Sequence, residues 1–446
     1  MLIDKLHFSG IIPTKEKNVI FYADEHNFHL MTDELYSPGD DNVITSIKTQ
    51  DGFIYGRTHN SHQILIYLGK KQIDFTSYCD YIFSSYVLST SNIYEVDMSM
   101  FDSIEFVGGT LEYLFYPCSL DLSPDDSDFG KIETKDDSIT CEVCLDGVNV
   151  KITIGTQPEC HWDNNGTKIT NSKVKYTLTF GEPQKLEKVY RLYHKTKELL
   201  SFLTDRKNVG FDEINICRGS GTFPCFAQLV VKEDYLLTNK DKFSNICFED
   251  IKDYLQNLIE LIYNSKDKKR SVSLGFYPDD DKSKSIINDN MVKAICSALE
   301  CELGFADYIK CKNDDVLLNL IDDVKSLVKK HEKCAEQQLA SKTYDMIFGS
   351  IRHWDFSLSD KLWELFEYFK NELLLASEYA STVNYDLIHK FVKYRNDITH
   401  GSYRVMDKDV ALVAQIFKGL VYCCLLKRIG LPIEIIDEFC KTKILK

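Results

Sequence analysis

The spacing of apolar residues changes near residue 235, and this change limits the folds open to the chain more than any other feature. Before it, short runs of β-branched and aromatic residues recur between turn signals, as in NVIFYA, HQILIYLG and VNVKITIG. Such runs are typical of strands, and steps such as Asp146-Gly147 supply tight turns between them. The first part therefore predicts an antiparallel sandwich or barrel. One segment, 186–208, has helical spacing and is expected to pack against the sheet.

The later part of the chain has apolar residues three and four apart, which is the spacing of amphipathic helices. Residues 248–263 predict one helix. Helical segments then cover 286–308, 313–338, 341–396 in two pieces, and 408–429. Long helices with short connections favour an up-and-down bundle.

These patterns predict an α+β chain in which an antiparallel β-rich domain precedes a helical bundle. We place the sandwich- or barrel-like domain at residues 1–235, a connector of helix and loop at 236–284, and the α-helical bundle at 285–446. Asp407 can cap the last long helix at its N-terminus, and Gly430 and Pro432 are expected to end it.

Charge and cysteine content narrow the class of protein. The net charge of −15 argues against a broad basic surface that coats nucleic acid. Nearly all of the negative charge lies in residues 1–312, so a local RNA site in the near-neutral remainder is permitted.

The N-terminus has no apolar run of signal-peptide length, and Lys418 interrupts the longest apolar stretch, 416–426. We expect a soluble, cytoplasmic protein without membrane contact, whose 15 cysteines are reduced thiols.

The segment 386–403, DLIHKFVKYRNDITHGSY, carries the most informative polar residues. A helical apolar stripe leads into Arg395, Asn396 and His400, and Gly401 suits the left-handed position just past a helix end. A four-residue step turns about 40° around a helix and a five-residue step about 140°, so Asn396 and His400 share a face and Arg395 lies to one side. The helix dipole favours the charged form of the His400 imidazole, whereas the nearby Arg395 guanidinium disfavours that form.

An R-N-x-x-x-H sequence at the end of a helix resembles the R-x(4–6)-H motif of the HEPN superfamily of ribonucleases. The order of helices over 286–429 is similar to that fold. A β-rich domain joined to a helical domain ending in RNDITHG most resembles ApeA-like anti-phage proteins. The segments FSGIIP and FVGGTLEYL carry a weaker N-terminal match.

The resemblance implies a metal-independent endoribonuclease that needs no cofactor, with two protomers meeting at the motif in a homodimer formed through the C-terminal bundle. Arg395 would then neutralise the scissile phosphate of an RNA substrate. His400 would act as general base or acid for attack by the ribose 2′-OH, and Asn396 would orient the phosphate or the imidazole. The β-rich domain would sense a phage-derived trigger or restrain the nuclease.

Other interpretations stay open at this point. The chain could be a non-catalytic sensor or interaction protein whose dimerising bundle binds RNA or nucleotides. Glu300, in ALECEL, could hold Arg395 or His400, although a solvated helix face is the simpler interpretation.

Further polar groups favour structural roles. The Cys141-x-x-Cys144 pair with Cys160-His161 has a composition seen in zinc sites, but a step of three along a strand places its two thiols on opposite faces. The residues 24–29 (DEHNFH) favour a polar hairpin, the motif 352–354 (RHW) ordinary packing, and the basic run 266–270 a solvated loop; we expect no metal and no nucleotide cofactor.

Overall fold

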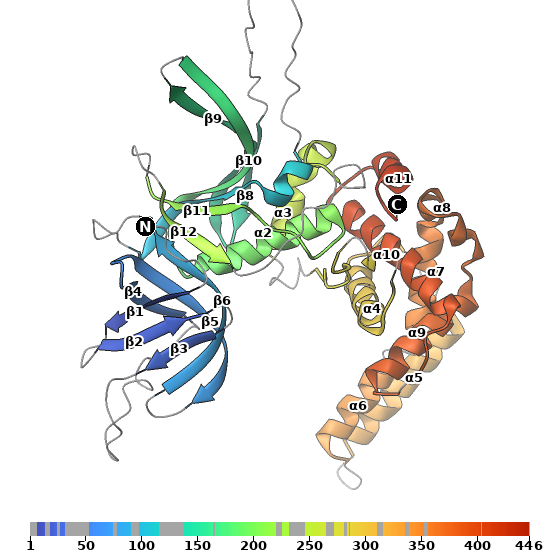
Figure 1. Cartoon of the computed structure of the whole chain (residues 1–446). Coiled ribbons are helices and arrows are strands. Elements are labelled where there is room, and N and C mark those ends of the chain that lie inside the picture. Colours follow the sequence, from blue (N-terminus) through green and yellow to red (C-terminus); the bar gives the residue numbers. More distant parts are fainter. Residues whose placement is uncertain are drawn as a thin grey trace, which may run out of the picture. The chain divides into compact units, whose positions relative to one another are not determined.

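The computed structural model divides into two compact units, Met1–Ser265 and Lys266–Lys446, each described here by itself (Figure 1). The described residues are 7–13, 18–24, 27–31, 53–74, 78–90, 98–115, 138–163, 166–219, 225–231, 246–264, 272–280, 283–284, 286–309, 315–334, 339–351, 356–402 and 404–445.

The first six strands of the first unit form a closed antiparallel barrel. Its order is β3-β2-β1-β4-β5-β6, and β6 pairs back with β3. Strand β6 belongs to two layers, because its residues 78–82 pair with β3 whereas 85–89 pair with β12. The strands are β1 (Phe8–Pro13), β2 (Asn18–Ala23), β3 (Asn27–Met31), β4 (Phe53–Thr58), β5 (Gln63–Asp74) and β6 (Tyr78–Ser89).

Alternate residues of these strands fill the barrel, as a pleated strand requires. Phe21, Phe28, Leu30 and Tyr86 are fully buried there, and Phe21 packs on Phe28 with ring centroids 5.3 Å apart. The antiparallel β-rich prediction is thus confirmed, and of the two arrangements it allowed, β1–β6 form the barrel.

The sheet continues from β6 as an open layer in the order β12-β11-β7-β10-β9-β8. The predicted helix over 186–208 is confirmed as α2, which contacts β10 and α3, while α3 packs on β8. The elements are β7 (Met100–Val107), η1 (Gly109–Tyr113), β8 (Ile139–Leu145), β9 (Val148–Asp163), β10 (Gly166–Lys185), α2 (Lys188–Thr204), β11 (Glu213–Cys217), β12 (Cys225–Val231), η3 (Glu249–Tyr254) and α3 (Leu255–Tyr263).

Gly10 is required where β1 crosses β4. A Cβ atom there would lie 2.1 Å from the Arg57 carbonyl oxygen and 2.6 Å from the Phe21 ring. We expect Gly10→Ala to lower the free energy of unfolding of the first unit by about 1–3 kcal/mol, because the barrel must open to admit the methyl group. Urea unfolding measures this. Gly349→Ala, inside α6 where no atom lies within 4 Å of the new Cβ, is the control; it should leave the first unit unchanged and not destabilise the second, since alanine favours a helix more than glycine does. A first unit that Gly10→Ala leaves as stable as wild type would contradict the tight crossing.

The second unit is helical, and α10 is its central helix. It contacts α4, α8, α9 and α11, and it is apolar on all sides, as expected of a helix that neighbours surround. The helices are α4 (Asp289–Leu303), α5 (Asp315–Glu332), α6 (Ser341–Ile351), α7 (Leu358–Tyr368), α8 (Lys370–Ala376), η5 (Glu378–Thr382), α9 (Tyr385–Thr399), α10 (Lys408–Arg428) and α11 (Ile433–Thr442).

One detail of the helical prediction is wrong. The segment 341–396 contains four α-helices rather than two, because Ser357 starts α7 with a capping box and Asn384 starts α9 by accepting from the Leu387 amide. Pro432 does follow the end of α10, but it also directly precedes α11, since proline is tolerated at a helix start. Asp407 caps α10 as predicted, accepting from the Asp409 and Val410 amides.

Helix α10 is the one candidate membrane span within the described residues. Its apolar window has a mean hydropathy of 1.7, but 78% of that window is buried inside the structure. Burial by protein explains the apolar composition, as it does for core helices of soluble proteins.

Candidate active site

The C-terminal end of α9 determines where the motif residues lie. Gly401 has φ +80°, and the Ser402 amide donates to the Asp397 carbonyl at 2.9 Å. This is the longer hydrogen bond of a Schellman ending, which glycine permits because it has no Cβ. His400 is the cap residue, directly before the turn, and its side chain is exposed.

Polar contacts fasten α9 to its neighbours on two sides. Lys390 Nζ lies 2.5 Å from Asp407 Oδ2 and 2.7 Å from Asp409 Oδ2, which ties α9 to the start of α10. This contact holds the pKa of the Asp407 carboxyl below its usual value. On the other side, the Tyr394 hydroxyl donates to Asp289 Oδ1 of α4 at 2.7 Å. The last turns of α9 therefore have a defined position against α4.

Arg395 is held by contacts to all three of its guanidinium nitrogens. Nε donates to the Cys296 sulfur at 3.1 Å, Nη1 donates to Asn396 Oδ1 at 2.9 Å, and Nη2 forms an ion pair with Glu300 Oε1. The Arg395 side chain is 19% exposed, so part of it still faces solvent. The guanidinium is thus preorganised, with further N–H groups of Nη1 and Nη2 left for another acceptor.

Two of the residues that hold Arg395 come from one face of α4. Cys296 and Glu300 are four residues apart, which places them one above the other on a helix. The buried Cys296 thiol has a raised pKa because of burial, which the Arg395 charge only partly offsets. The uncharged thiol therefore serves as a weak acceptor, and Glu300 supplies the negative charge.

The structure brings together three of the four residues singled out by sequence. Arg395, Asn396 and Glu300 are in contact; the Glu300 side chain is 42% exposed, so it lies on a solvated helix face and also pairs with Arg395. Asn396 contacts the guanidinium; within the described part of the chain, the His400 imidazole has no hydrogen-bond partner. Cys296 was missed as a contact of Arg395, since its apolar surroundings indicated only packing; the four-residue step to Glu300 was the available signal.

Glu302, on the same helix, faces the interior instead. Its side chain is 3% exposed and accepts from Arg428 Nη1 at 2.7 Å. Burial raises the pKa of Glu302 to about 7, and the Arg428 charge only partly opposes this.

The stability of the second unit should therefore depend on Glu302 between pH 4.5 and 7. The folded state binds the proton more tightly than the unfolded state, so this contribution is present below pH 4.5 and is lost as pH rises through about 7. We expect the unfolding free energy of wild type relative to Glu302→Gln to fall by about 3 kcal/mol over this range. Urea titrations at several pH values measure it. Glu364→Gln, which changes an exposed residue, is the control. If the unfolding free energies of Glu302→Gln and wild type changed in parallel with pH, the expectation would be refuted.

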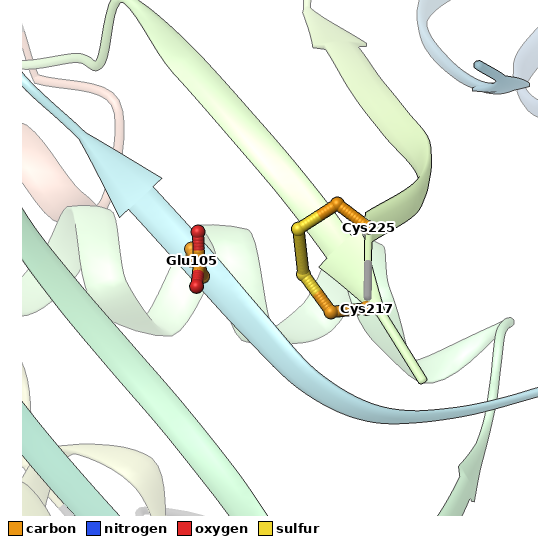
Figure 2. A group of neighbouring side chains, drawn as sticks. All are labelled: Glu105, Cys217 and Cys225. Carbon is orange, nitrogen blue, oxygen red and sulfur yellow. A yellow bond between two sulfur atoms is a disulfide. The ribbon is translucent and has the colours of Figure 1, made fainter. Parts of the chain in front are cut away.

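A second cluster lies in the first unit, where Glu105 of β7 is near Cys217 and Cys225 (Figure 2). The three side chains offer ligand atoms within 4.8 Å of one another. The two cysteines, however, form a disulfide, because the antiparallel register of β11 and β12 places them opposite each other. The expectation of reduced thiols is therefore wrong for this pair. Paired sulfurs are poor metal ligands, and we assign no metal here.

The remaining candidates do not form a site among the residues that the structure describes. Cys141 is half-buried and Cys144 exposed, on opposite faces of β8 as predicted. His29 Nε2 lies 3.1 Å from Asp24 Oδ2 across the β2–β3 turn, which fits the polar hairpin. The motif 352–354, the basic run 266–270 and the side chains of residues 160 and 161 lie outside the described residues.

Comparison with known protein families matches one stretch of the second unit. The family model described as Apea-like HEPN matches residues 321–434, about a quarter of the chain. The matched stretch contains Arg395, Asn396 and His400, whereas Cys296 and Glu300 precede it. No curated protein and no solved structure matches the chain. The C-terminal region thus carries an Apea-like HEPN domain, and an antiparallel β-rich unit precedes it.

Proposed function

We propose that the Apea-like HEPN domain of this chain is a metal-independent endoribonuclease acting in the cytoplasm in anti-phage defence. The observation that carries the proposal is the end of α9, where a preorganised guanidinium and an exposed imidazole lie five residues apart within the matched stretch. Arg395 and His400 are the two chemical groups that RNA transesterification needs when protein side chains supply all the catalysis.

Arg395 supplies charge stabilisation in this mechanism. Its unused N–H groups bind the scissile phosphate and stabilise the negative charge that develops on the non-bridging oxygens. Glu300 and Asn396 hold the guanidinium at fixed orientation, so little reorganisation is needed when RNA binds. Glu300 also limits the positive charge of the site in the absence of RNA.

His400 moves the proton. As a neutral base, its imidazole takes the proton from the ribose 2′-OH, whose oxygen attacks the phosphorus; as an acid, an imidazolium protonates the departing 5′ oxygen. The products are a 2′,3′-cyclic phosphate and a 5′-OH end. A deoxyribose has no such nucleophile, so the reaction selects RNA.

Two protomers complete the site in this proposal. A C2 dimer formed through the helical unit brings the Arg395 of one protomer to the His400 of the other, and this one imidazole first takes the 2′-OH proton and then returns it to the departing 5′ oxygen. If Arg395 and His400 of a site come from different protomers, mixing inactive Arg395→Ala and His400→Ala proteins should restore about a quarter of wild-type activity, since half of the dimers are mixed and each has one complete site. No recovery would indicate sites within single protomers.

RNA cleavage in EDTA tests the proposal. Wild type is expected to cut RNA without divalent metal and to leave 2′,3′-cyclic phosphate and 5′-OH ends, which end-labelling identifies. A strand with deoxyribose at the cleavage position should resist. Cleavage that needs added metal, or products with 5′-phosphates, would exclude this chemistry.

One observation favours a non-catalytic alternative. The contacts of Arg395 to Cys296, Asn396 and Glu300 are also those of a structural arginine. The chain would then be a sensor whose dimerising HEPN bundle binds RNA or a nucleotide without cutting. It predicts RNA binding that survives His400→Ala and no cleavage by wild type.

A further inference from the structure

Helix α5 of the second unit exposes a stripe of large apolar side chains. The helix packs on α6, as Figure 1 shows, and of its 18 residues only Ile321 is buried. Val316, Leu320 and Leu327 are 76%, 54% and 67% exposed. Steps of four and seven residues place these three side chains within about 40° of one another around the helix axis. Exposed apolar side chains gathered along one line of a helix indicate a docking surface.

Two charged residues lie in the same stripe. Leu320, Asp323, Leu327 and Lys330 follow one another in steps of three, four and three residues. This is the spacing with which one helix contacts another along its length. Asp323 and Lys330 are exposed, like the two leucines beside them. The stripe therefore presents apolar and charged groups in alternation.

Neither charge has an opposite charge within reach on its own helix. None of the residues three or four positions from Asp323 is a cation, and none of those around Lys330 is an anion. Asp322 and Lys325, outside the stripe, do pair, with Lys325 Nζ 3.8 Å from Asp322 Oδ1. The side chains of Asp323 and Lys330 are thus placed to form ion pairs with another chain.

The two halves of α5 carry opposite charges. Three of its four acidic residues precede position 324, whereas all three lysines follow it. These residues are Asp315, Asp322, Asp323, Lys325, Lys329 and Lys330. Two copies of the helix that lie side by side and antiparallel bring the acidic half of each to the basic half of the other. A parallel pair would place like charges together, which is unfavourable.

We propose that a second copy of this chain docks on α5, with the two helices antiparallel about a two-fold axis at Leu327. The Leu327 side chains then pack on each other at the axis. Asp323 and Lys330 lie four and three residues to either side, so Asp323 of each chain reaches Lys330 of the other. The contact thus contains two ion pairs around an apolar centre.

Other occupants fit this stripe less well. The acidic half of α5 repels the phosphates of RNA, and insertion into a lipid surface would have to desolvate Asp323 between the two leucines. The proposal gives the dimer expected of the nuclease a contact surface, but it does not depend on RNA cleavage.

Analytical ultracentrifugation of the full chain over a range of concentrations tests the proposal. We expect a reversible dimer with a Kd of about 1–100 µM, because one pair of helices is a small interface. Leu327→Ser should raise this Kd about tenfold or more, since both copies lose the side chain at the axis. Met346→Ser is the matched control, because Met346 is 68% exposed on α6, outside the stripe, and the dimer should not change.

Exchange of the two charges tests the antiparallel arrangement. Asp323→Lys and Lys330→Asp should each weaken the dimer about tenfold, because each replaces attraction by repulsion at two places. The double variant should dimerise nearly as well as wild type, since its ion pairs form with the charges exchanged. Seven residues separate the two positions by about 10 Å along the helix, so a contact within one helix cannot explain such a rescue.

Several results would overturn this assignment. They are a chain that stays monomeric at about 100 µM, a dimer that Leu327→Ser leaves unchanged, and no rescue by the double charge exchange. Binding of an RNA oligonucleotide or of phospholipid vesicles to a monomeric chain, lost in Leu327→Ser, would give the stripe to that ligand instead. All substituted residues are exposed, and thermal unfolding checks each fold. Cleavage is not measured here, so an inactive chain that dimerises in this way would refute only the proposed function.

Discussion

His400→Ala is expected to slow RNA cleavage by about 10²–10⁴-fold, the range that a general acid or base contributes. The loss should arise in the chemical step, so RNA binding stays close to that of wild type. Single-turnover cleavage in EDTA measures the rate, and filter binding measures affinity.

The same change should leave the protein as stable as wild type. His400 is exposed at the cap of α9, and within the described residues its imidazole contacts no hydrogen-bond partner. Removing an exposed side chain of this kind usually changes stability by less than about 0.5 kcal/mol. Loss of cleavage with an unchanged melting temperature therefore separates catalysis from folding.

His389→Ala is the matched control for this experiment. It removes a histidine from the same helix, one bonded to Ser359 Oγ at 3.3 Å and outside the motif. We expect normal cleavage. If His389→Ala and His400→Ala were equally active, His400 would have no catalytic role.

Arg395→Lys is expected to lower cleavage by about 10²–10³-fold, although it keeps the positive charge. An ammonium cannot contact Cys296, Asn396 and Glu300 together and still offer a planar pair of N–H groups to a phosphate. Glu300 can be hydrated, because its side chain is 42% exposed, so the stability loss should stay below about 1 kcal/mol.

Arg404→Lys provides the comparison for the arginine. Arg404 pairs with Asp397 at 3.0 Å near the end of α9, and its side chain is 53% exposed. Its replacement should leave cleavage intact. Full activity of Arg395→Lys would mean that charge alone suffices and that the held guanidinium geometry serves only the fold.

Local chemistry in the sequence determined the two classes of structure and the end of α9. Apolar and polar residues alternate in the first part of the chain, and apolar residues lie three and four apart in the second. Both patterns follow from the way strands and helices bury one face. Asn384, Asp407 and Gly401 begin or end their helices through contacts within a few residues, which a sequence reveals directly. For the same reason, the position of His400 at the end of α9 followed from the motif itself.

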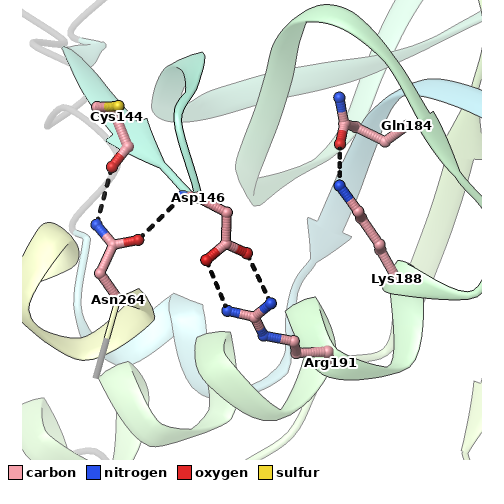
Figure 3. Close-up of polar contacts among 6 residues, drawn as sticks. All are labelled: Cys144, Asp146, Gln184, Lys188, Arg191 and Asn264. Carbon is pink, nitrogen blue, oxygen red and sulfur yellow. Dashed lines mark hydrogen bonds and ion pairs between the residues drawn. The ribbon is translucent and has the colours of Figure 1, made fainter. Parts of the chain in front are cut away.

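Contacts between residues far apart in the sequence could be seen only in the tertiary structure. The return of β6 to β3 and the contact of Cys296 and Glu300 with Arg395, about a hundred residues away, depend on which surfaces meet. So do the contacts beside α2, where Gln184 of β10 accepts from Lys188 and Asp146 of the β8–β9 turn binds Arg191 (Figure 3). Apolar burial drives such contacts without direction, so periodicity indicates which face is buried but not against what.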